Sequence, residues 1–445
     1  MQGTTDAAPG PGALLDQKAR RLAAQGQLEE AAGAFREVLA HDGNHLPALN
    51  FLAQRAWAAG RLDESLELLG RALTVNPAQP TLHLNAALVQ VAKGDMDAAL
   101  AEFDQAIALK PDHLGALLHK ASALDTAGRV REAATPYLRA MTLAADPAKV
   151  FGGRPPPANI AELLRRARQV VQQTRHELLG EALTPLRERY GADALARLDH
   201  ALDIYLGRAV AEYPHPKQRP ATLFFPGLPP RPFFEREEFP WLGGFEAATA
   251  DIRAELEAVL QTPEEFKPYV DKAPGSADAR YWQDVNRSTR WSTFRLFKAG
   301  ASVEDNCRRC PLTVAALESI PLMRVPGFSP EAMFSVLEPH TRIPAHHGSV
   351  NGRLIVHLPL IVPENCGGLR VADETRGWQE AQCLVFDDSF AHEAWNDSER
   401  TRVVLIFDIW NPLLSEAEKA GFAAALEAMG RFNYAALGEA ALKDG

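Results

Sequence analysis

The sequence is poor in cysteine and has no long hydrophobic run. Its four cysteines include a single C-x-x-C pair, Cys307 and Cys310, whereas a zinc site of four cysteines would need a second pair. Free thiols in a reducing compartment are therefore expected. No stretch of about 18 uninterrupted apolar residues occurs, so no membrane span is predicted. The first 15 residues lack the basic and apolar regions of a secretory signal, and a cytoplasmic location is the expectation.

Basic residues are in the minority. The chain has 57 acidic residues against 47 lysines and arginines, which gives a net charge of −10. This balance disfavours nonspecific binding to nucleic acid or to an anionic membrane. A length of 445 residues suggests two or three domains, and a hydrophobic content of 46% supports a sizeable core.

The first third of the chain contains a repeat of 34 residues. Glycine recurs at this interval, followed five positions later by a small residue and nine positions later by a large apolar one. The glycines are Gly26, Gly60, Gly94 and Gly128; the small residues are Ala31, Ser65, Ala99 and Ala133; the large residues are Phe35, Leu69, Phe103 and Tyr137. Pro77 and Pro111 follow 17 positions after two of the glycines.

This pattern resembles the tetratricopeptide repeat. Glycine permits the tight turn between two helices, the small residue lets the helices approach closely, and proline ends the second helix. A generic helical bundle would not keep the period. The resemblance implies a curved solenoid whose concave face binds another protein or a peptide. We assign it to residues 13–148, after a segment 1–12 that is predicted to be disordered.

Two segments connect this array to the rest of the chain. Residues 159–213 have the pattern of helices with basic residues between apolar positions, and we expect them to cap the solenoid. Residues 214–243 are predicted to form an extended proline-rich connector. The remaining residues, 244–445, are assigned to one domain, which opens with an amphipathic helix over Gly244–Leu260.

Short strands dominate this last domain. Apolar runs of strand length alternate there with Gly, Pro, Asn and Asp, which indicates a barrel or jelly roll. The predicted strands are Trp291–Phe297, Phe334–Leu337, Arg353–Val362, Leu369–Ala372, Cys383–Phe386, His392–Trp395 and Arg402–Ile409. A short helix is predicted over Thr313–Ile320, and a last helix after Ser415, where S-E-A-E matches a capping box.

Histidines and arginines lie within these apolar strands, where burial without partners is costly. His346 is followed two residues later by Gly348, His392 lies 46 residues further on, and Arg402 is ten residues beyond it. Non-haem iron oxygenases on double-stranded β-helices commonly use H-x-D/E…H and a downstream basic residue, because two histidines and one carboxylate leave metal positions open. Here the carboxylate position is Gly348, which cannot bind a metal.

Several sequence blocks resemble the aspartyl/asparaginyl β-hydroxylase family in their order and spacing. They are PGLPPRPFF, WSTFRLF, HHGSVNGRLIVHL, ADETRGW, FDDSFAHEAWND and RVVLIFDIWNP, within residues 222 to about 425. This family keeps glycine where related oxygenases have the carboxylate, and some members carry tetratricopeptide repeats before the catalytic domain. The resemblance implies a multi-domain α + β fold in which a double-stranded β-helix (a jelly-roll, cupin-like domain) follows the helical solenoid.

The same resemblance implies a function and a set of site residues. The chain would be an Fe(II)/2-oxoglutarate-dependent dioxygenase that uses O2, converts 2-oxoglutarate to succinate, and hydroxylates Asp or Asn in a peptide or protein. His346 and His392 would bind Fe(II). Arg402 would pair with the distal carboxylate of 2-oxoglutarate; Ser335 would contact the same group, and His357 would lie near the proximal carboxylate.

Other polar and aromatic residues have secondary roles in this scheme. Arg353 and Trp291 would line the cosubstrate or substrate pocket. His347 follows the first predicted ligand, but neighbouring side chains on a strand point to opposite faces, so His346 is preferred. Asp387 and Asp388 are interpreted as turn residues.

One departure from the family leaves the substrate open. Ile355 stands where better-known members have arginine, two residues before the position of His357. One alternative is the same oxygenase chemistry on an acyl chain or a small metabolite. Another is a tetratricopeptide interaction scaffold with an inactive oxygenase domain. If the chain is a dioxygenase that hydroxylates Asp or Asn, the repeats would recruit or orient the substrate.

Overall fold

The computed structural model describes residues 11–146, 150–273 and 277–438. The chain divides into two compact units, Met1–Thr174 and Arg175–Gly445. Most of the segment predicted to be disordered, and the predicted end of the array at residue 148, lie outside the described residues. Within the described residues, no helix combines the length and the apolar character that a bilayer crossing requires.

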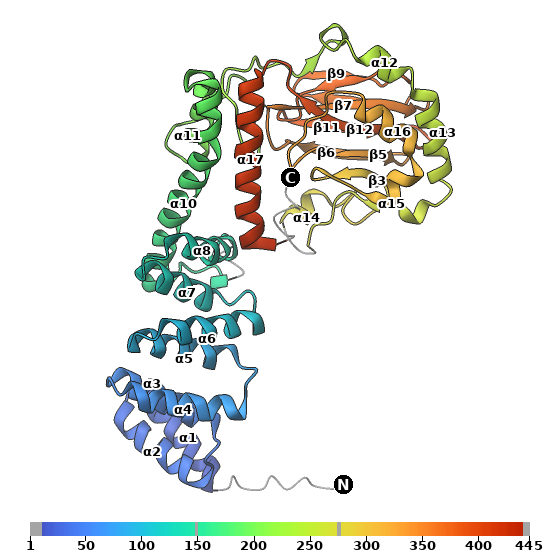
Figure 1. Ribbon diagram of the computed structural model, residues 1–445. Helices are drawn as coiled ribbons and strands as arrows, with labels where there is room; N and C mark the ends of the chain where they lie inside the picture. The colour runs from blue at the N-terminus through green and yellow to red at the C-terminus, as the bar shows by residue number, and fades with distance from the viewer. Residues whose placement is uncertain (1–10, 147–149, 274–276, 439–445) are drawn as a thin grey trace, which may run out of the picture. The chain divides into compact units, whose positions relative to one another are not determined.

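The N-terminal unit is built from helical hairpins (Figure 1). Its repeat helices are α1 (Pro11–Ala24), α2 (Leu28–His41), α3 (Leu46–Ala58), α4 (Leu62–Val75), α5 (Pro80–Lys93), α6 (Met96–Leu109), α7 (Leu114–Thr126) and α8 (Val130–Ala144). The four repeat glycines have φ between 75° and 86°, in the left-handed region that a tight turn requires. The small repeat residues are fully buried, and the large ones are at most 3% exposed. The tetratricopeptide prediction is confirmed.

Helix α10 (Ala158–Tyr190) belongs to both units. In its first half, the Arg166 guanidinium donates to both Asp125 carboxylate oxygens, at 2.6 and 2.8 Å, which joins it to the last repeat. Its second half packs with η1 (Asp193–Leu195), α11 (Ala196–Tyr205) and α17 (Glu416–Leu437) in one hydrophobic cluster. The segment expected to cap the solenoid therefore also buries the C-terminal helix.

The C-terminal unit contains two antiparallel sheets. The larger has the order β1-β10-β7-β12-β5-β3-β2, with β4 beside β3; the smaller has the order β6-β11-β8-β9. The strands are β1 (Phe233–Phe234), β2 (Lys267–Pro268), β3 (Trp291–Lys298), β4 (Ala301–Ser302), β5 (Ala332–Leu337), β6 (Thr341–His346), β7 (Arg353–Ile361), β8 (Leu369–Val371), β9 (Glu374–Arg376), β10 (Leu384–Phe386), β11 (His392–Asn396) and β12 (Arg402–Trp410). The two sheets confirm the α + β class, while the double-stranded β-helix stays a prediction.

Alternation along the central strands separates the face that packs against helices from the face that carries the buried arginines and histidines. On β7 and β12, residues such as Leu354, Val356 and Leu405 join a core with the helices that cover the larger sheet. These helices, shown on the right of Figure 1, include α13 (Thr249–Val259), α15 (Glu304–Arg309) and α16 (Pro311–Glu318). The alternate residues, among them Arg353 and His357, point to the other face. Every arginine and histidine predicted for the site on these strands lies on that face.

Three local predictions need correction or extension. The helix predicted over Gly244–Leu260 is two helices, α12 (Leu242–Glu246) and α13. At the break, the Thr249 hydroxyl donates to the Glu246 carbonyl at 2.6 Å. Strand β6 was not predicted, since Pro344 argues against a strand interior; the sheet order places β6 at an edge, where proline is tolerated. The turns η2 (Arg236–Glu238) and η3 (Pro263–Glu265) and the short helix α14 (Ala277–Tyr281) were also not predicted.

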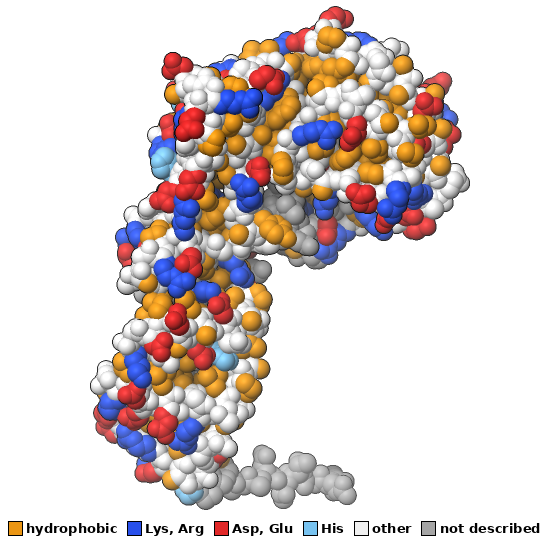
Figure 2. Space-filling view, viewed as in Figure 1, with side chains coloured by type: hydrophobic (Ala, Val, Ile, Leu, Met, Phe, Trp, Pro, Cys, Tyr) orange, Lys and Arg blue, Asp and Glu red, His pale blue; other side chains and the backbone are white. Residues whose placement is uncertain are grey.

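Charges are mixed on the surface. On the face shown in Figure 2, acidic and basic side chains are interspersed over both units rather than gathered by sign. The capping box of α17 is present as predicted: the Ser415 hydroxyl accepts from the Glu418 amide, and the Glu418 carboxylate accepts from the Ser415 amide at 2.8 Å.

Candidate metal and anion site

Two histidines from different strands meet in the smaller sheet. His346 ends β6 and His392 begins β11, and the two are directly opposite each other in the ladder. Their ring centroids are 4.0 Å apart. The structure thus brings together the two side chains that the sequence places 46 residues apart.

Both rings are held in the same tautomer. Nδ1 of His346 donates to the Pro344 carbonyl and Nδ1 of His392 to the Phe390 carbonyl, each at 2.9 Å. Burial lowers the pKa of His346 to about 3, helped by the neighbouring His392 ring, and burial lowers the pKa of His392 to about 4. Each ring is therefore neutral at pH 7 and keeps its Nε2 lone pair, which is the arrangement of a metal-binding histidine.

The position of the missing carboxylate is filled by another residue. A Cβ atom on Gly348 would overlap the carboxylate of Asp388. That carboxylate accepts from Nη2 of Arg353 at 2.8 Å. Among the described residues, no group of three His, Cys, Asp or Glu side chains is arranged to hold a metal, so a metal here would have two histidine ligands.

Arg402 is a buried cation without an acid beside it. Its side chain is 1% exposed, at the start of β12, and its Nε and Nη1 have no hydrogen-bond partner among the described residues. Its guanidinium lies over the Trp378 ring, 4.4 Å from the centroid. Burial lowers the pKa of Arg402 to about 10, which leaves it charged at pH 7. Two unpartnered donors on a planar cation fit a carboxylate ligand.

Ser335 and His357 share the sheet face of Arg402. The Ser335 hydroxyl accepts from the Trp291 indole at 3.2 Å, so its own proton is free to donate. Nδ1 of His357 accepts from the Trp378 indole at 3.3 Å, which places the ring proton on Nε2. Burial, then the Arg402 charge, holds the pKa of His357 well below its usual range. Both residues therefore offer one neutral donor.

Arg353 differs from Arg402 because carboxylates neutralise it. Its Nη2 pairs with Asp388 at 2.8 Å and its Nη1 with Asp408 at 3.5 Å, and all three side chains are buried. Burial alone would lower the pKa of Arg353, but the two carboxylates raise it above its ordinary value. Its place in the cosubstrate or substrate pocket stays a prediction, and its two terminal nitrogens are already paired with these carboxylates. Asp387 keeps the predicted turn role, since its carboxylate accepts from the Ser389 amide at 2.9 Å.

Aromatic rings enclose the histidine side of the site. Trp291, predicted as a pocket residue, is 5% exposed and stacks on Tyr269 and Trp282, with centroids 4.2 and 6.1 Å away. Trp282 also meets the His346 ring edge-on at 5.2 Å. Sequence reasoning missed Trp282, because it lies in a polar loop without periodicity. Trp378 is a further aromatic residue of the site, because its indole contacts both His357 and Arg402.

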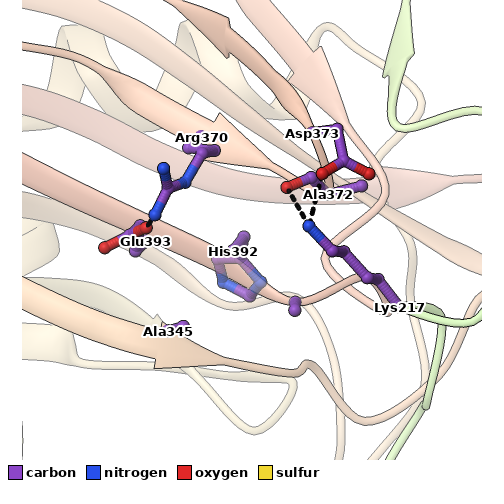
Figure 3. A pocket seen from close by; sticks show the side chains of 8 residues that line it. Lys217, Ala345, Arg370, Ala372, Asp373, His392 and Glu393 are labelled. Atoms are coloured by element: carbon purple, nitrogen blue, oxygen red, sulfur yellow. Dashed lines mark hydrogen bonds and ion pairs between the residues drawn. The ribbon is translucent and has the colours of Figure 1, made fainter.

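A pocket of about 380 Å³ opens beside His392 (Figure 3). Lys217 donates to Asp373 on one side at 2.5 Å, and Arg370 pairs with Glu393 on the other. Alanines complete the lining: Ala345, Ala372 and Ala391. The charges of this pocket balance, so it offers no excess cation to an acidic ligand.

Comparisons with known proteins agree with this division. A model of the family described as aspartyl/asparaginyl beta-hydroxylase matches residues 246–412, and tetratricopeptide models match 17–83, 51–113 and 84–149. An ornithine lipid ester-linked acyl 2-hydroxylase of Rhizobium tropici is 41% identical over 194 residues, 43% of this chain and 65% of that protein.

Two vertebrate relatives carry the name aspartate beta-hydroxylase domain-containing protein 2. The mouse protein is 31% identical over 257 residues, 55% of this chain and 71% of its own length. The human protein is 34% identical over 207 residues, 45% of this chain and 53% of its own length. This chain thus spans between about half and about two thirds of the curated relatives named first.

The neutral state of the two histidines gives a pH test on the metal-free protein. With pKa values of about 3 and about 4, we expect the ring signals of His346 and His392 not to titrate by NMR between pH 7.5 and pH 5.5. The unfolded chain binds these protons near pH 6.5. Folding stability that depends on the neutral rings is thus present above pH 6.5 and decreases as the pH falls toward 4. A titration midpoint near 6.5 for either ring would contradict the assignment.

Proposed function

This chain belongs to the aspartyl/asparaginyl β-hydroxylase family, and we propose that it is an Fe(II)- and 2-oxoglutarate-dependent dioxygenase that hydroxylates a carbon of its substrate. The observation that carries the proposal is the buried Arg402 guanidinium, whose Nε and Nη1 have no partner among the described residues. An uncompensated buried charge is strongly destabilising, so a carboxylate ligand is the natural complement. The pair of His346 and His392 would hold the metal ion to which this ligand also binds.

The two histidines are suitable ligands for Fe(II) and would leave its other coordination positions free for the cosubstrate and O2. Imidazole nitrogen is a good ligand for Fe(II), and sites with few protein ligands keep positions for other groups. His346 and His392 would bind through Nε2, with their Nδ1 protons fixed by backbone carbonyls. When bound, Fe(II), 2-oxoglutarate and O2 supply the oxidant for an unreactive C–H bond, and 2-oxoglutarate leaves as succinate and CO2.

The remaining side chains bind and orient the cosubstrate. Arg402 and the Ser335 hydroxyl would hold its distal carboxylate through charge-assisted hydrogen bonds. His357 would donate its Nε2 proton to the proximal carboxylate. Trp291 and Trp378 cover these groups and exclude water, which strengthens each electrostatic contact.

For the substrate, we propose a peptide or protein asparagine or aspartate, recruited by the repeats. The charge balance favours the asparagine amide over the aspartate carboxylate. Arg402 is committed to the cosubstrate, Arg353 is paired with two carboxylates, and Ile355 adds no cation. A second carboxylate in the cavity would have no partner, and burying it would be costly.

An uncharged acyl chain is the second candidate substrate. Ile355 packs with the cluster of apolar side chains between the sheets, which includes Phe386 and Phe390. This apolar surface would contact a hydrocarbon chain as readily as an uncharged amide. The Rhizobium relative, by its name, acts on a lipid acyl chain.

Loss of either histidine should abolish metal binding. We expect His346→Ala and His392→Ala to weaken Co(II) binding, measured by visible absorption, by at least about 100-fold, and to stop succinate formation. His340→Ala is the matched control, because that ring is exposed and pairs only with Glu399. Wild-type affinity in both variants would exclude the site and leave the interaction scaffold as the better reading.

Replacing Arg402 should separate cosubstrate binding from metal binding. Arg402→Met removes the cation and keeps an unbranched side chain, and we expect the KM for 2-oxoglutarate to rise about 100-fold, within the range for losing a buried charged contact. Co(II) affinity should stay within about twofold. Arg376→Met, at a pair with Glu235 and Glu374, is the control. An unchanged KM would show that 2-oxoglutarate does not use Arg402.

Mass spectrometry can rank the substrates. Incubation with enzyme, Fe(II) and 2-oxoglutarate should add one oxygen to asparagine peptides faster than to matched aspartate peptides. Ile355→Arg should reverse that preference, because it adds a cation to the cavity. An oxygen gained only by an acylated amphiphile would support the second candidate instead.

A further inference from the structure

The proline-rich connector contributes a stretch that runs along the histidine site. We call residues 217–225 the strap. It lies outside the region matched by the hydroxylase family model, residues 246–412. Its backbone bonds to two segments near the histidines: residues 387–391, which lead into His392, and residues 347–351, which leave His346. The Lys217 side chain reaches a third segment, at Ala372 and Asp373.

The first half of the strap is bonded to the segment before His392. The Ala391 amide donates to the Lys217 carbonyl at 2.8 Å, and the Arg219 amide donates to the Ser389 carbonyl at 2.8 Å. Gln218 and Phe390 form an antiparallel bridge between these two bonds. This short antiparallel pairing continues the backbone hydrogen bonding of β11 to the residues just before His392.

Gln218 adds a side-chain anchor at the same place. It is 1% exposed, and its amide nitrogen donates to the Asp387 carboxylate and to the Ser389 hydroxyl, each at 3.1 Å. Burial raises the pKa of Asp387 to about 8. The Gln218 amide supplies a hydrogen-bond donor to this buried carboxyl group. Asp387 lies five residues before His392, in a turn outside the smaller sheet.

The second half of the strap is bonded to the segment after His346. The Ala221 amide donates to the Gly348 carbonyl at 3.0 Å, and the Thr222 amide to the Ser349 carbonyl at 2.8 Å. Asn351 closes this half: its side chain accepts from the Phe225 amide at 2.6 Å and donates to the Phe225 carbonyl at 2.9 Å.

The two histidines need such support from outside the sheet. Each stands at the end of its strand, and the β6–β11 register shifts between His392 and Ala394. One direct bond joins the two segments, from the Gly348 amide to the Asp388 carbonyl at 2.6 Å. The strap bonds to both segments and fixes their separation.

We infer that the strap sets the spacing of His346 and His392, with Gln218 as a positioning residue. The inference rests on the proposed metal site, since spacing matters only if both rings bind one ion. Gln218 acts through the turn before His392 and touches neither ligand. Outer partners of this kind typically contribute about 10- to 100-fold to metal affinity.

Two variants of the full chain test the inference. Gln218→Leu keeps the volume and removes the donor, and Ala221→Pro removes the N–H that bonds Gly348 without altering any buried side chain. Gln261→Leu is the matched control, because that glutamine is exposed and its side chain donates to the Glu257 carbonyl in the preceding helix, α13. The readouts are Co(II) affinity and amide hydrogen exchange of the metal-free protein.

We expect Co(II) affinity to fall at least tenfold in both strap variants and to be unchanged in the control. Exchange should accelerate in peptides covering residues 346–351 and 387–392, while peptides from β3 keep wild-type rates. If Gln218→Leu accelerates hydrogen exchange in all peptides, that variant is globally destabilised, and the Ala221→Pro variant then decides the test.

Wild-type affinity together with wild-type exchange in Ala221→Pro would overturn the inference and leave the proposed function intact. Absence of divalent-metal binding by the unaltered chain would instead overturn the proposed function, and the positioning role with it.

Discussion

An arginine buried between two sheets without an acid beside it is the constraint on which the C-terminal unit depends. Removing a cation from water costs several kcal/mol unless a partner compensates, and the Arg402 guanidinium lies over the face of Trp378 with Nε and Nη1 unpartnered among the described residues. The polar side chains on the same sheet face include Ser335 and His357, which are neutral donors. This arrangement is the basis of the proposal that Arg402 binds a carboxylate ligand.

The other buried arginine shows how the same residue type can be made structural. Arg353 sits between Asp388 and Asp408, and all three side chains are buried. The outer faces of the same strands carry leucine, valine and phenylalanine against the covering helices. One face of the larger sheet thus packs against helices, and the other carries the buried polar residues together with a second apolar cluster.

Sequence alone reached much of this organisation, for identifiable reasons. The repeat is local and periodic, so glycine turns and buried alanines follow from a 34-residue register. Seven strands could be located because apolar runs and turn residues alternate. His346, His392 and Arg402 were found through a resemblance, since nothing local in a sequence shows that residues 46 positions apart share a ladder pair. The features that the sequence did not reveal depend on long-range contacts. Pro344 argues against a strand, but β6 lies at a sheet edge where proline is tolerated. The contacts of Trp282, Gln218 and Trp378 with the site involve segments that are distant in sequence.

The packing at Gly348 limits how this site can change over evolutionary time. The space next to its Cα is already taken by the Asp388 carboxylate, which is itself bound to Arg353. A codon change that introduced an acid at position 348 would collide with this pair rather than add a ligand. An acid at position 348 could be accommodated only if the Asp388 side chain moved, which would disturb its pair with Arg353. Substitutions at positions 348, 353 and 388 are therefore expected to have non-additive effects on stability.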